Sequence, residues 1–99
     1  MIKLQSGKLN IIIDGQFGST GKGVLSSYVA ANNHIDLAIT NGSPNAGHTF
    51  YYNNKKYIVK HLPVSAVINK RSTIYLCAGS IINPDILLKE IVTCGADLK

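Results

Sequence analysis

Residues 9–31, LNIIIDGQFGSTGKGVLSSYVAA, hold an apolar run, a glycine-rich stretch and an amphipathic segment in direct succession. The apolar run Leu9–Ile13 is short and ends at Asp14-Gly15, so it predicts a strand buried on both faces. The glycines permit tight turns, and Val24–Ala31 has helical spacing of its apolar residues. Strand, glycine loop and helix in this order predict a phosphate-binding element in a parallel α/β fold.

The segments that follow predict a parallel sheet with flanking helices. Asp36–Thr40 predicts a second strand, parallel to the first across the intervening helix. Thr73–Ala78 predicts a further buried strand. Asn83 and Pro84 predict the start of a helix that ends at Gly95, because Asn caps amino termini, Pro suits the first helical position and Gly suits the residue after the last turn.

An antiparallel hairpin is predicted in the middle of the chain. Thr49–Tyr52 and Lys56–His61 flank Asn53-Asn54, and Asn tolerates the positive φ that a tight turn requires. The predicted fold class is therefore α/β, with a parallel sheet, flanking helices and this hairpin. Such a sheet leaves edges and faces uncovered, so we expect residues 1–99 to be the N-terminal part of a single larger domain.

Composition restricts the class of protein. The 99 residues are 45% hydrophobic and 15% charged, which suffices for a packed core and excludes a disordered chain. No apolar run approaches the ~18 residues of a membrane span. The N-terminal residues MIKLQSGKLN lack the apolar region of a signal peptide. We expect a soluble, cytoplasmic protein without a membrane partner.

The net charge of +5 suits an anionic partner, either nucleotide phosphate or nucleic acid. A solvated face of the hairpin and the loop after it explains the same charge equally well. Five basic residues fall in a stretch without any acid: Lys55, Lys56, Lys60, Lys70 and Arg71.

The cysteines and two of the histidines carry no strong functional signal. Cys77 and Cys94 form no CxxC pair, and Cys77 lies in an apolar run, so a small core side chain is the default interpretation. His34 and His61 lack a glycine-rich context and are expected to be structural or surface residues.

The glycine loop runs from Gly15 to Gly23 and matches the phosphate-binding context in part. Backbone N–H groups, the amino end of the following helix and Lys22 would all attract a phosphate. The Walker pattern fails twice, because the spacing to Gly21 is one residue too long and Gly23 replaces the usual hydroxyl residue. A purely structural turn is the alternative.

A second loop, Asn45-Ala46-Gly47-His48-Thr49, follows the second predicted strand. Loops after parallel strands gather at the carboxyl edge of the sheet, where ligands bind. We therefore expect His48 to face the glycine loop, where it can act as proton donor or electrophile. A structural histidine is the alternative.

Together these motifs resemble the N-terminal part of the adenylosuccinate synthetase family. Gly18–Gly23 joined to Asn45–Thr49 is the specific pair, and the resemblance extends from about Leu9 to Asp97. Further matching strings are His61-Leu62-Pro63, Ala78-Gly79-Ser80 and Asn83-Pro84.

The resemblance implies a P-loop-like α/β fold and a two-step ligation. A nucleoside triphosphate with Mg²⁺ phosphorylates the 6-oxygen of a purine nucleoside monophosphate, and the amine of L-aspartate then displaces that phosphate. It also implies a homodimer for the full-length protein. The phosphate donor, among ATP, dATP and GTP, stays open because base recognition lies outside these residues.

Residue roles follow from the same resemblance. Lys22 would contact the transferring phosphate, and His48 would stabilise charge on the 6-oxygen. The Gly47 carbonyl would bind Mg²⁺, while Asn45 and Ala46 would line the purine monophosphate site. The implied nucleotide-binding residues are Gly18, Ser19, Thr20, Gly21, Lys22, Gly23, Gly47, His48 and Thr49.

Ser19 is the main departure from the family pattern. The usual loop reads GDEGKG, and its Asp accepts the purine N1 proton and binds Mg²⁺; here the Ser19 hydroxyl takes over the catalytic, substrate-binding and metal position, although a hydroxyl is a poor base and a weaker ligand. Asp14 is the only acid close in sequence and is expected to be structural. Phage synthases that act on dGMP resemble this chain in QFGSTGKG (16–23) and PNAGHT (44–49).

The expected function is a ligase that joins L-aspartate to C6 of dGMP and yields 2-amino-2'-deoxy-N6-succinyladenylate. The alternatives are an ordinary adenylosuccinate synthetase acting on IMP and a non-catalytic nucleotide-binding fragment. The basic stretch does not by itself favour nucleic-acid binding, which would have to be salt-sensitive and not competed by free nucleotide.

Overall fold

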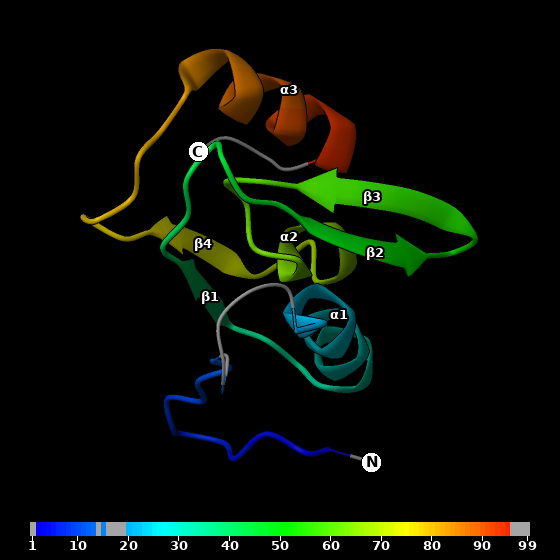
Figure 1. Cartoon of the computed structure of the whole chain (residues 1–99). Coiled ribbons are helices and arrows are strands. Elements are labelled where there is room, and N and C mark those ends of the chain that lie inside the picture. Colours follow the sequence, from blue (N-terminus) through cyan, green and yellow to red (C-terminus); the bar gives the residue numbers. More distant parts are fainter. Residues whose placement is uncertain (1, 14, 16–19, 96–99) are drawn as a thin grey trace.

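The computed structural model describes residues 2–13, 15 and 20–95. A two-stranded parallel sheet and an antiparallel hairpin lie among helices (Figure 1). The predicted mixed α/β class is thereby confirmed. The elements in chain order are α1 (Lys22–Asn32), β1 (Leu37–Thr40), β2 (His48–Tyr52), β3 (Lys55–Val59), α2 (Ser65–Ile68), β4 (Thr73–Leu76) and α3 (Pro84–Cys94).

The parallel sheet pairs β1 with β4, in a register from Leu37 opposite Thr73 to Thr40 opposite Leu76. Both strands were predicted, but Thr73–Ala78 is less buried than expected. Tyr75 is 58% exposed, because β4 alternates between an exposed and a half-buried face instead of being covered on both. Because β1 and β4 are parallel, their carboxyl ends lie at the same edge of the sheet.

The predicted strand at Leu9–Ile13 is wrong for this structure. These residues form no strand, and Leu9, Ile11 and Ile13 are exposed. The described N-terminal segment bonds elsewhere: the Leu4 N–H donates to the Asn33 side chain, which donates in turn to the Ile2 carbonyl. The parallel partner of β1 is consequently β4, and not the apolar run before α1.

The hairpin forms where Asn53 and Asn54 were expected to turn the chain. Their φ angles of 50° and 62° are the left-handed values that Asn tolerates and that a two-residue turn requires. The inward face carries Phe50, which stacks on Tyr57 with ring centroids 5.5 Å apart. Figure 1 shows the hairpin with α3 on one side and α1 and α2 on the other.

The core fills the space between the hairpin and these helices. Phe50 is 1% exposed, and Cys94 at the end of α3 is also buried, whereas Cys77 is half-buried. Burial raises the pKa of the Cys94 thiol, with the nearby Glu90 charge as a second cause. The buried cluster consists of Phe50, Val59, Leu62, Val64, Ala66, Val67 and Cys94.

Both ends of α3 follow the sequence prediction. The Asn83 side chain accepts hydrogen bonds from the backbone N–H groups of Asp85 and Ile86, and Pro84 occupies the first helical position. Gly95 adopts φ 67° after the last turn, where only glycine avoids a Cβ penalty. Both helix ends therefore coincide with local capping signals.

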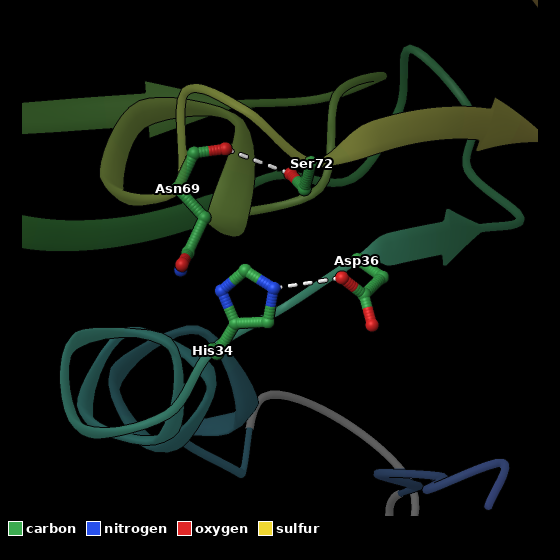
Figure 2. Close-up of polar contacts among 4 residues, drawn as sticks. All are labelled: His34, Asp36, Asn69 and Ser72. Carbon is green, nitrogen blue, oxygen red and sulfur yellow. Dashed lines mark hydrogen bonds and ion pairs between the residues drawn. The ribbon is translucent and has the colours of Figure 1, made fainter. Parts of the chain in front are cut away.

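The segment 69–72 connects the carboxyl ends of all three helices at the amino ends of β1 and β4. Asn69 donates through its side chain to Ala30 of α1 and through its N–H to Ser65 of α2. Lys70 donates to the Cys94 carbonyl of α3, which places a positive charge where the helix dipole is negative. Figure 2 shows this end, where Ser72 donates to the Asn69 carbonyl and the exposed His34 pairs with Asp36.

Among the described residues, none of the helices is long and apolar enough to cross a membrane.

Candidate nucleotide-binding site

The loops after β1 and β4 lie side by side at the carboxyl edge of the parallel sheet. The Ile81 N–H donates to the Gly42 carbonyl at 3.0 Å. The Ser80 hydroxyl lies 3.4 Å from the side-chain oxygen of Asn41, to which it donates. The segment after β1 leads into the second loop, which was expected at this edge, and the segment after β4 lies beside it.

The amino end of α1 is shaped by Gly21. Its φ of 84° is left-handed, and a Cβ built there would meet no atom within 4 Å. Glycine is therefore required at this position by backbone conformation and not by lack of space. Gly21 is exposed and has no side chain with which to cap the first turn of α1, where the positive end of the helix dipole lies.

Gly23 and His48 bring the two predicted loops together. A Cβ on Gly23 would lie 2.9 Å from the His48 Cβ and 3.4 Å from the Thr49 carbonyl oxygen. The first turn of α1 thus packs against the first residue of β2, and this contact is possible only without a side chain at position 23. The sequence showed Gly23 as a departure from the Walker pattern, and the structure supplies its physical reason.

The rest of the second loop is exposed. Asn45 and Ala46 lie in a turn closed from Ser43, whose hydroxyl and carbonyl accept their N–H groups at 3.3 and 3.5 Å. Gly47 is exposed beside the end of β3, with the Val59 carbonyl 3.5 Å from where its Cβ would be. The structure therefore holds this loop at the same edge as the start of α1.

The remaining predicted site residues are distributed as follows. Lys22 and His48 are half-buried, and Thr20 and Thr49 are exposed. Gly18, Ser19 and Asp14 lie outside the described residues. Within the described part of the chain, no three His, Cys, Asp or Glu side chains are grouped as a metal site.

Comparison with known proteins places this geometry in a family. A model of the family described as adenylosuccinate synthetase matches residues 11–97. The chain belongs to the adenylosuccinate synthetase family. The matched range includes both the glycine loop and the second loop, so the resemblance expected from these motifs is confirmed.

Individual relatives carry two different names. The chain is 39% identical over 92% of its length to an N6-succino-2-amino-2'-deoxyadenylate synthase of Salmonella phage PMBT28. It is 42% identical over 82% of its length to the synthase of that name from Cyanophage S-2L. An adenylosuccinate synthetase of Chlorobium chlorochromatii is 38% identical over 92% of the chain. The chain spans between 20% and 25% of the length of these curated relatives.

Two buried polar residues of this adenylosuccinate synthetase family member form hydrogen bonds between the segment after β3 and α3. His61 is 1% exposed, and its Nε2 accepts the Asn83 N–H at 3.1 Å, so it is structural, as expected. Glu90 is 7% exposed and accepts hydrogen bonds from the N–H groups of residues 60–62. Sequence reasoning placed Glu90 only within a helix, because nothing local signals that its partners lie about thirty positions away.

Proposed function

We propose that the protein is a ligase that joins L-aspartate to C6 of a purine nucleoside monophosphate at the expense of a nucleoside triphosphate. The observation that carries this proposal is the packing of Gly23 against His48. It joins a glycine-flanked helix terminus, suited to phosphates, to a loop that carries a group able to polarise an oxygen. Membership of the adenylosuccinate synthetase family supports the same reaction class.

The chemistry requires positioning and charge stabilisation more than covalent catalysis. The α1 terminus and Lys22 would hold the triphosphate with its γ-phosphorus toward the purine 6-oxygen. His48 would donate a hydrogen bond to that oxygen and stabilise the charge that develops there. The aspartate amine would then attack C6, and the phosphorylated oxygen would leave as inorganic phosphate.

The residues present fit Mg²⁺ at this edge. A magnesium ion on a triphosphate takes few protein ligands and retains several waters, so a cluster of acids is not required. The carbonyl of the exposed Gly47 would be one oxygen ligand, and the Ser19 hydroxyl of the glycine loop would be a second. When bound, the ion would neutralise charge on the phosphates.

For the purine, we propose dGMP, because Ser19 replaces the family's carboxylate and because phage relatives at 39% and 42% identity are named as synthases of N6-succino-2-amino-2'-deoxyadenylate. A small hydroxyl leaves room for, and can bond to, the 2-amino edge of guanine. IMP is the second candidate, supported by the 38% identical adenylosuccinate synthetase. Asn45 and Ala46 would contact the monophosphate in either case. We further propose a cytoplasmic homodimer, as the family implies.

The test is a steady-state assay of the purified gene product with L-aspartate, Mg²⁺ and ATP, dATP or GTP. Product from dGMP and none from IMP would support the proposal. Equal turnover of both would contradict the dGMP assignment, and turnover of IMP alone would establish the second candidate. Binding of a triphosphate without product from either purine would identify a non-catalytic nucleotide-binding protein and overturn the ligase.

A further inference from the structure

The Glu90 carboxylate is buried and is satisfied by backbone alone. Its two oxygens accept hydrogen bonds from the successive N–H groups of Lys60, His61 and Leu62, at donor–acceptor distances of 2.5 to 3.3 Å. No lysine or arginine of the described residues forms an ion pair with it. A buried anion of this kind is costly unless every acceptor is used, and bonds to a charged acceptor are stronger than neutral ones.

The turn held by Glu90 contacts the chain before the second loop and adjoins the strand residue that pairs with His48 in this loop. At the entrance, a Cβ on Gly42 would lie 2.8 Å from the Lys60 carbonyl oxygen, so the two backbones are in direct contact. At the exit, His48 pairs with Val59, the residue before this turn. A displacement of the 60–62 turn would therefore move Gly42 by direct contact and His48 through its strand partner Val59.

A further hydrogen bond, at the amino end of α3, also holds the 60–62 turn. The Asn83 N–H at the start of α3 donates to His61, in the middle of the turn. Helix α3 thus forms hydrogen bonds with the 60–62 turn through Asn83 at its amino end and through Glu90 nearly two helical turns later. Because both hydrogen-bonding groups belong to one helix, together they fix the position and the orientation of the turn.

We propose that Glu90 is a positioning residue of the ligase site, which sets the second loop and His48 through the 60–62 turn. The inference rests on the proposed function for its kinetic part only. It requires no contact between Glu90 and substrate. A small misplacement of His48 would remove a hydrogen bond that matters most in the transition state, so the effect falls on kcat.

The test compares Glu90→Gln and Glu90→Asp with Asp85→Asn, which removes the same charge from an exposed position on the same helix. In Glu90→Gln the amide NH₂ group faces backbone donors, and we expect kcat to fall about 10- to 100-fold. The KM for the triphosphate, held by α1, should stay within about twofold, while the KM for the monophosphate rises. Glu90→Asp should recover part of kcat, and Asp85→Asn should match the wild type.

NMR of the same proteins separates this inference from the ligase proposal. We expect the backbone amide resonances of residues 60–62 and the ring resonances of His48 to shift in Glu90→Gln and not in Asp85→Asn. If the wild type lacks ligase activity, a shift of the His48 ring still supports the positioning role and its absence contradicts it. Unchanged His48 signals and kcat in a folded variant would reduce Glu90 to a structural residue. Should Glu90→Gln fail to fold, the same two readouts on Glu90→Asp decide.

Discussion

The Cα of Gly23 in α1 faces the side chain of His48 in β2 so closely that a Cβ on the glycine would lie 2.9 Å from the histidine Cβ. Real Cβ atoms do not approach to that distance, so one of the two elements would have to move. The first turn of α1 can therefore lie this close to β2 only while position 23 lacks a side chain. This dependence can be tested directly.

Gly23→Ala should push the first turn of α1 away from β2. We expect it to lower the free energy of unfolding by about 1–3 kcal/mol, the usual cost of overpacking, and to weaken triphosphate binding at least tenfold. Calorimetry with a non-hydrolysable triphosphate and chemical denaturation measure the two effects. Gly15→Ala is the stability control, because a Cβ there meets no atom within 4 Å. Wild-type affinity in Gly23→Ala would show that the contact does not organise the site.

Ser19→Asp restores the acid of the usual family loop and tests the substrate assignment. A carboxylate is the better base for the purine N1 proton and the better magnesium ligand. We expect the ratio of kcat/KM for IMP to that for dGMP to rise by at least tenfold. Ser19→Ala is the matched control, since it removes the hydroxyl without adding charge and should weaken dGMP use without promoting IMP. A ratio unchanged by the acid would show that specificity is set elsewhere.

Phe50 and Tyr51 are neighbours on β2 with opposite surroundings. Phe50 is 1% exposed and stacks on Tyr57, whereas Tyr51 is 68% exposed. Phe50→Ala should cost about 3–5 kcal/mol of unfolding free energy, from lost burial and the cavity left behind. Tyr51→Ala should change it by less than about 0.5 kcal/mol. Urea denaturation of both variants measures the difference, and equal losses would mean that the hairpin packs through its other face.

The Cys94 thiol should make stability depend on pH under alkaline conditions. Burial raises its pKa above the ordinary value, so the folded protein keeps a proton that the unfolded chain releases. Unfolding is then favoured as pH rises, and the free energy of unfolding falls from about the ordinary thiol pKa upward. Denaturation between pH 7 and 10.5 tests the slope, and Cys94→Ala should flatten it.

The half-buried Cys77 should react faster than the buried Cys94 with a thiol reagent at pH 8.

Features specified by neighbouring residues could be predicted from the sequence. Asn53-Asn54 supplies the two positive φ angles of the hairpin, and Asn83-Pro84 and Gly95 cap α3 at the expected residues. The carboxyl edge of the sheet was expected to carry the site because parallel strands end together. Each of these inferences needs only local chemistry or general topology.

Features that depend on residues far apart in the chain could not be predicted. The short apolar run Leu9–Ile13 suits a buried strand, yet which segment pairs with it depends on tertiary structure, and β4 takes the place beside β1. The sequence predicted that His48 faces the glycine loop, but not that it lies in direct contact with Gly23. Nor did it show that Glu90 accepts hydrogen bonds from residues 28 to 30 positions earlier. The roles of Ser19, Lys22 and Gly47 stay predictions that the assays above address.

The segment 69–72 receives the carboxyl ends of all three helices, and it lies at the amino ends of the strands, away from Gly23 and His48. The two ends of the parallel sheet therefore differ in what they hold. Hydrogen bonds that join the three helices lie at one end of the sheet, while the loops of the candidate site lie at the other. We therefore expect substitutions in these loops to leave the hydrogen bonds of segment 69–72 in place.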